Sequence, residues 1–166
     1  MIPDYKNTDE IRLWQHEKFL SEIRRLSKQH DWVLVYMHWG NEFIDVPSNQ
    51  QIHAGRELID AGASAVVGCH SHVLQPVEAY RDGLIAYSLG NFLFDSYLKM
   101  TFPTIIFQLQ LQTNPKKIVC QICPLSAQKD YSLCKASREI ERRIRKQVSQ
   151  SVVPVPEDVY LSLIHI

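Results

Sequence analysis

Residues 32–37 read Trp-Val-Leu-Val-Tyr-Met, an unbroken apolar run that ends at His38-Trp39-Gly40. An apolar run of this length without alternation is typical of a strand that is buried on both faces of an α/β sheet. A second short run, Ala65-Val-Val67, ends at Gly68 and predicts another buried strand. The segment between the two runs therefore decides how these strands are connected.

That segment has the pattern of an amphipathic helix. Residues 48–61 place Ile52, Leu58 and Ile59 on one face, and Gly62 follows in the C-cap position. A strand, a helix and a strand in this order predict a parallel crossover, in which loops at the carboxyl ends of the strands conventionally carry the site.

The rest of the chain adds a helix before this unit and antiparallel strands after it. The predicted elements are a helix that ends near Gln29, strand pairs at 77–80 with 84–88 and at 104–112 with 117–125, and a basic helix over 131–150. Asp82-Gly83 and Asn114-Pro115 supply turns within the two pairs. The sequence thus predicts an α/β fold with a mixed sheet, parallel in its core.

The composition excludes several classes of partner. The 166 residues are 45% apolar and 22% charged, and 18 acidic residues balance 18 basic ones. This balance predicts a globular domain with no nucleic-acid partner, because nucleic-acid binding generally requires a basic surface. The six basic residues between Lys135 and Lys146 are interpreted as a solvated helix face rather than a binding surface.

Three histidines stand at the ends of the two core strands. His38 follows the first run, and His70 and His72 follow the second. Residues two apart in an extended segment point to the same side, so His70 and His72 are expected to face one site, and neighbouring parallel strands would bring His38 to the same edge. Imidazole is a common ligand of zinc, manganese and iron ions. A single histidine in such a place is more often a loop residue, and three of them name neither a metal nor a reaction.

Several spaced motifs carry a family resemblance. They are His38-Trp-Gly-Asn-Glu42, Pro47 with Gln50, Leu58-Ile-Asp-Ala-Gly-Ala63, Val67-Gly-Cys-His-Ser-His-Val-Leu-Gln-Pro76 and Tyr87-Ser-Leu-Gly-Asn-Phe-Leu-Phe-Asp95. In this order they closely resemble the CapA family of bacterial capsule and poly-γ-glutamate biosynthesis, densely from residue 32 to 95 and loosely to about 125. Cys69 and Ser71 depart from residues that are common in relatives.

CapA proteins are similar to calcineurin-like phosphoesterases, and this resemblance implies both the fold and the site. The chain would be the C-terminal half of a metallophosphatase-like layered α/β sandwich with a mixed sheet. His38 and His70 would bind one divalent ion of the Mn, Fe or Zn class and His72 a second. Glu42 and Asn91 would lie near the site, next to the ligands or the substrate, although Asn91 beside Gly90 also fits a turn.

The resemblance also implies what the segment lacks. In such enzymes the metal-binding aspartates and an Asn-His motif precede the region that begins here, and no Gly-Asp or Asn-His of that type occurs before His38. The chain is therefore expected to hold at most one ion weakly by itself. Its expected partners are the missing N-terminal half of the same domain and, in the cell, polyglutamate or the capsule-synthesis machinery.

The predicted organisation has three parts. Residues 1–125 would be the C-terminal half of the metallophosphatase-like domain and residues 126–160 a basic helix and tail. Residues 161–166, Leu-Ser-Leu-Ile-His-Ile, match one reading frame of a common sequencing adapter and are interpreted as read-through, with a short apolar tail as the alternative.

Three functions remain open from the sequence. The leading one is a component of capsular poly-γ-glutamate synthesis or export, with a metal-dependent hydrolase site in the complete protein. The alternatives are a non-catalytic envelope or assembly protein that retains the fold, and a general metal-dependent phosphodiesterase. Many relatives act at the bacterial cell envelope, whereas the sequence itself assigns no location.

Overall fold

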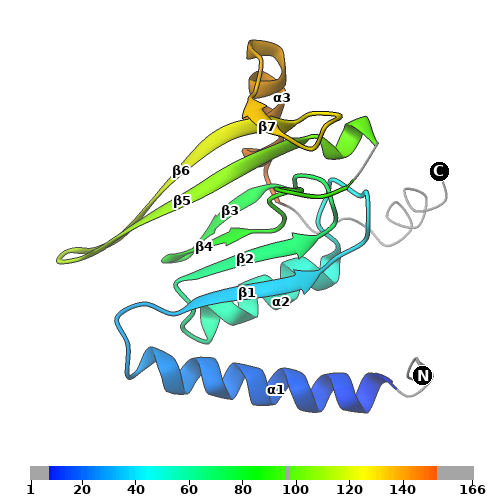
Figure 1. The fold of residues 1–166 in the computed structure, drawn as a ribbon. Coiled ribbons are helices and arrows are strands. Elements are labelled where there is room, and N and C mark those ends of the chain that lie inside the picture. Colours follow the sequence, from blue (N-terminus) through cyan, green and yellow to red (C-terminus); the bar gives the residue numbers. More distant parts are fainter. Residues whose placement is uncertain (1–7, 96–97, 153–166) are drawn as a thin grey trace.

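The computed structural model describes the backbone of residues 8–95 and 98–152, and the side chains of those ranges from His16 onward. Figure 1 shows two helices on one side of a sheet and a long, curved strand pair on the other. The predicted α/β class with a mixed sheet is confirmed. The tail beyond residue 152, including residues 161–166, lies outside the described residues.

The first sheet has four strands in the order β1-β2-β4-β3. Its strands and the two helices that belong to it are α1 (Thr8–Ser27), β1 (Leu34–Trp39), α2 (Asn49–Asp60), β2 (Ala65–His70), β3 (Val77–Tyr80) and β4 (Gly83–Ala86). β1 pairs parallel to β2, and β2 pairs parallel to β4, whereas β3 pairs antiparallel to β4. The predicted parallel crossover and the predicted hairpin are both confirmed, although the turn residues are Arg81 and Asp82 and Gly83 already belongs to β4.

The crossover helix α2 has well-defined ends. Ser48 is its N-cap and accepts from the backbone N–H of Gln51, while the Gln51 side chain accepts from the backbone N–H of Ser48. This reciprocal pair is a capping box. At the other end Ala61 is the C-cap, and Gly62 comes one residue later with a φ of 111°, a conformation that favours glycine.

One core lies between the helices and the first sheet. Leu20 and Ile23 of α1 pack with the predicted inward residues of α2 and with Val35 of β1. Phe19 of the same helix is 41% exposed. Only one face of a surface helix packs against the core. An apolar side chain outside that face, such as Phe19, stays in contact with solvent.

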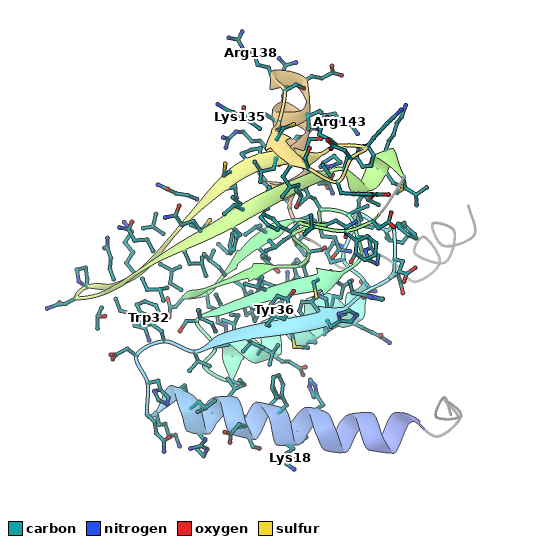
Figure 2. All side chains as sticks on the ribbon, in the orientation of Figure 1. Lys18, Trp32, Tyr36, Lys135, Arg138 and Arg143 are labelled. Atoms are coloured by element: carbon teal, nitrogen blue, oxygen red, sulfur yellow. The ribbon has the colours of Figure 1, made fainter. Side chains whose placement is uncertain are left out.

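β1 differs from its prediction as a strand buried on both faces. Val35 points into the core, but Leu34 is 53% exposed and Tyr36 is 71% exposed. β1 is an edge strand within the described sheet, and successive side chains alternate between faces. The second sheet packs over β3 and β4, so the face of β1 that points away from the helices is not covered by it. Figure 2 shows Tyr36 on this outer strand.

The second sheet is antiparallel, in the order β5-β6-β7. Its elements and neighbours are the short 3₁₀ helix η2 (Lys99–Thr101), β5 (Pro103–Thr113), β6 (Lys116–Ala127), β7 (Leu133–Lys135) and α3 (Arg138–Val148). The predicted pair at 104–112 and 117–125 is confirmed. A second core joins Leu74 and Ile105 to Ile144 and Val148 of α3.

The prediction of one basic helix over 131–150 is wrong at its start. Residues 133–135 form β7, and Ser137 caps α3 by accepting from the backbone N–H of Ile140. Helical periodicity alone did not distinguish these residues from a short edge strand. The expected boundary at residue 125 stays a prediction, although β6 continues through it to Ala127 and pairs with β7.

No helix within the described residues is both long enough and apolar enough to span a membrane.

Candidate functional site

The three histidines meet at the carboxyl edge of β1 and β2. His38 is the next-to-last residue of β1 and pairs in register with Cys69, and His70 is the last residue of β2. The rings of His38 and His70 have centroids 4.5 Å apart, and those of His70 and His72 are 6.1 Å apart. The strand ends therefore bring all three imidazoles together, although His38 lies within its strand rather than after it.

His70 and His72 do not reach this position through an extended segment, as the sequence pattern predicted. The φ angles are 101° at His70 and 59° at His72, and the intervening Ser71 is buried. Positive φ is uncommon for residues other than glycine and concentrates at functional sites. The alternation argument was therefore wrong in its geometry, and a tight left-handed turn positions the pair instead.

Asn91 lies against His72, as expected of a residue near the site. Nδ1 of His72 is 2.9 Å from Oδ1 of Asn91. An amide oxygen can only accept, so the imidazole Nδ1–H donates, and Nε2 of the neutral ring keeps its lone pair. The preceding Gly90 has a φ of 72°, a conformation that favours glycine. Phe43 and Phe94 lie against His72, with centroids 5.7 and 4.5 Å from its ring.

His38 has a different surrounding. It is exposed, and Nδ1 lies 3.4 Å from Sγ of Cys69. A hydrogen bond between Tyr36 and Cys69, with a smaller contribution from burial, raises the pKa of the Tyr36 phenol. The sequence analysis did not predict that Cys69 and Tyr36 lie near His38. Tyr36 could have been identified, because side chains two residues apart in a strand lie on the same face.

Glu42 makes no hydrogen bond to any of the three histidines within the described residues. It lies in the exposed loop after β1, and within the described residues it makes no hydrogen bond or ion pair. Its role at the site stays a prediction.

Buried side-chain amides hold the loop between β1 and α2 in place. Nε2 of Gln75 donates to the carbonyl oxygens of Ile44 and Val46, at 2.9 and 3.2 Å. Oε1 of Gln75 accepts from Nε2 of Gln51 at 2.9 Å. Both glutamines are buried, so their amides replace water as partners of the loop backbone. Sequence reasoning quoted Gln75 within a motif but did not assign it this role.

The donor set does not by itself fit a two-metal centre. Three imidazoles converge, yet within residues 8–95 and 98–152 no group of three His, Cys, Asp or Glu side chains is placed to hold an ion together. Two buried polar atoms beside His72, Oγ of Ser71 and Nδ2 of Asn91, have no hydrogen-bond partner within the described residues. Orphaned buried polar atoms are rare in native proteins, so their occurrence beside His72 is unusual.

Comparison with known families identifies the chain. The family model described as "Bacterial capsule synthesis protein PGA_cap" matches residues 2–96, more than half of the sequence. The chain belongs to this family. The matched residues contain all three histidines and Asn91, so the edge of β1 and β2 lies within the region that the family model matches.

Individual relatives agree with this assignment. "PGA biosynthesis protein CapA" of Bacillus subtilis strain 168 is 39% identical over 109 residues, which are 66% of this chain and 29% of that protein. "Capsule biosynthesis protein CapA" of Bacillus anthracis is 36% identical over 120 residues, 72% of this chain and 29% of that protein.

A more distant relative covers more of the chain. "Probable polyglutamine synthesis accessory protein" of Mycobacterium tuberculosis strain CDC 1551 is 26% identical over 145 residues, 78% of this chain and 37% of that protein. In each case the chain spans well under half of the relative's length.

Proposed function

We propose that this chain is part of a protein that takes part in capsular poly-γ-glutamate synthesis or export. We further propose that His38, His70 and His72 contribute ligands to a metal-dependent hydrolase site of the complete protein. The observation that carries the second proposal is the convergence of the three rings at one strand edge. The names of the PGA_cap relatives support the first.

In this proposal the remainder of the protein completes the site. Two divalent ions of the Mn, Fe or Zn class need carboxylate or similar ligands besides imidazoles. An N-terminal half of the same domain would supply them and would also cover the exposed face of β1.

One observation favours a second candidate, a non-catalytic envelope or assembly protein that keeps the fold. The described residues contain no group of three His, Cys, Asp or Glu placed to hold an ion. In that case the histidine edge would be a relic or a structural feature, and the surface of the protein would bind polymer or partners.

A direct experiment separates these functions from a general phosphodiesterase. The full-length protein would be purified and assayed on a panel of phosphoesters and γ-glutamyl amides, beside its His70→Asn variant. We expect hydrolysis of a γ-glutamyl amide that the variant loses. Hydrolysis of simple phosphodiesters alone would favour the phosphodiesterase, and no hydrolysis, with loss of surface polymer in a deletion strain, would favour the assembly protein.

A further inference from the structure

A cavity of about 290 Å³ lies between the loop after β1 and the helix α3. Six of its nine lining residues are apolar, among them Phe43, Leu74 and Ile144. Its polar side chains are Asp45, Arg143 and Gln147. A mainly apolar pocket with a few convergent polar groups is the usual form of a small-ligand site.

The cavity is next to the histidine edge. Phe43 lines it and also stacks on His72, with ring centroids 5.7 Å apart and planes at 26°. The backbone N–H of Phe43 donates to the carbonyl of Ser71 at 2.8 Å, which fixes the ring between the cavity and the turn that carries the histidines. A ligand in the cavity is thus separated from His72 by one aromatic ring.

The pocket walls are held together from both sides. Nε2 of Gln147 on α3 donates to the backbone carbonyl of Asp45 at 2.7 Å. Buried Gln75 holds the same loop one residue to either side, at Ile44 and Val46. The cavity is therefore built on anchored backbone rather than on a free loop.

Its two charged groups do not neutralise each other. The salt bridges of the described residues include neither Arg143 nor Asp45. By contrast, Arg145 on the same helix is paired with Glu141 at 2.8 Å. Arg143 is a planar fork of donors that matches a carboxylate, and Asp45 can accept from an ammonium or an amide N–H. Figure 2 shows Arg143 at the α3 end of the molecule, with Lys135 and Arg138.

We propose that this cavity binds the amino-terminal glutamyl unit of a γ-glutamyl chain, with its α-carboxylate on Arg143 and its α-ammonium beside Asp45. This inference rests on the proposed role in poly-γ-glutamate metabolism. The methylene groups of the unit lie on the apolar wall.

The charge pattern selects the end of the chain over its interior. Every unit of a γ-linked polyglutamate carries a free α-carboxylate, but only the amino-terminal unit carries a positive charge on the same carbon. An interior unit offers Asp45 only a neutral amide N–H, and charge-assisted hydrogen bonds are roughly twice as strong as neutral ones. A purely anionic ligand would also place its charge near the Asp45 carboxylate.

The test is an NMR titration of the full-length protein with γ-L-glutamyl-L-glutamate and with its N-acetyl derivative. We expect saturable shifts at the amides of residues 43–45 and 143–147 with the free dipeptide, and affinity at least about tenfold weaker for the acetylated one. Arg143→Gln and Asp45→Asn should each weaken binding of the free dipeptide by about tenfold or more, since each removes a charge-assisted hydrogen bond.

Arg142→Gln is the matched control, because Arg142 is an exposed arginine of the same helix that does not line the cavity. If Arg142→Gln weakens binding as much as Arg143→Gln does, the dipeptide is attracted to the basic helix in general and the proposed site is wrong. If both dipeptides bind equally well, the cavity does not recognise the amino-terminal unit. Absence of binding to a chain whose spectrum shows it folded would overturn the proposal. The capsule phenotype and the metal content of the full-length protein are separate measurements that test the proposed function. The cavity proposal and the proposed function can therefore fail independently.

Discussion

The indole Nε1–H of Trp39 donates to the backbone carbonyl of Tyr87, 2.9 Å away. Trp39 ends β1 and Tyr87 follows β4, so the bond passes over β2, which lies between them. It does so at Gly68, where a Cβ atom would lie 2.1 Å from that carbonyl oxygen and 2.2 Å from Nε1. The absence of a side chain at Gly68 thus leaves room for this hydrogen bond, which links β1 to the end of β4 across the strand that carries His70.

Gly68→Ala should lower the free energy of unfolding by about 3 kcal/mol, because the added methyl overpacks the strand and breaks the Trp39 hydrogen bond. Urea unfolding followed by circular dichroism would measure it. Gly55→Ala is the comparison and should have a smaller effect: its Cβ would meet Cγ2 of Ile85 at 3.1 Å and Cη2 of Trp39 at 3.3 Å, which shifts of a few tenths of an ångström relieve, and alanine is favoured in a helix. Equal effects of the two substitutions would contradict the account of Gly68.

Tyr87→Phe should destabilise the fold by about 1–3 kcal/mol, since the phenol donates to Oε2 of Glu78 at 2.6 Å in a partly buried site. Glu78 would keep only its ion pair with Arg56. Tyr80→Phe removes a longer contact, 3.5 Å to Asp60, and should have little effect. Thermal unfolding of both variants would test this difference.

The same phenol predicts how stability depends on pH. Burial, and then the hydrogen bond to Glu78, raise the pKa of Tyr87 far above its ordinary value. In the unfolded chain the group loses its proton near pH 10, while the folded chain retains it. The folded state then binds more protons, so stability should fall as pH rises above about 10. Tyr87→Phe should remove that part of the fall, and an unchanged alkaline slope in the variant would contradict the assignment.

The sequence predicted the parallel core well because its signals were local and mutually consistent. The two apolar runs form strands, the segment between them forms a capped helix, and the chain turns back before Gly83, as predicted. The exposure of Leu34 and Tyr36 could not be predicted, because burial of a strand face depends on what packs against it and not on the strand. β7 was missed for a related reason: three residues are too few to show a period.

The site was predicted in part. The positions of His38 and His70 followed from the predicted strand ends. The positive φ angles of His70 and His72 could not be predicted, because such angles are normally expected only at glycine. The contact between Asn91 and His72 was expected only as proximity. The links through Gln51, Gln75 and Cys69 depend on three-dimensional packing, which no spacing rule indicates.

Asn91→Ala should weaken metal binding by the full-length protein by about tenfold, because residues that orient a histidine ligand typically contribute that much. Without the amide oxygen, the Nδ1–H of His72 loses its acceptor and the ring can turn. Asn91→Asp keeps an acceptor at the same place and should restore most of the affinity. Titration with Mn²⁺ or Zn²⁺ against a competing chelator measures both, and equal affinities for the alanine variant and the wild type would exclude this positioning role.

The chain expressed alone should be poorly soluble or self-associate through the exposed face of β1. Exposed edge strands with apolar side chains are templates for pairing, and lysine on such an edge suppresses it. The double substitution Leu34→Lys with Tyr36→Lys should therefore shift the chain towards monomer in sedimentation velocity. Ile106→Lys, at a 46% exposed position of β5, is the control and should change the distribution little. A sharp monomer before any substitution would argue against an uncovered interface.

The most direct test of the central claim is the metal content of the full-length protein, measured by mass spectrometry of the purified wild type and of a variant in which His38, His70 and His72 are all replaced by alanine. His53→Ala, an exposed histidine on α2, serves as the control. The account predicts that the triple variant loses most of its bound divalent metal while the control keeps it. Undiminished metal in a folded triple variant would contradict the proposal that these imidazoles form a metal centre.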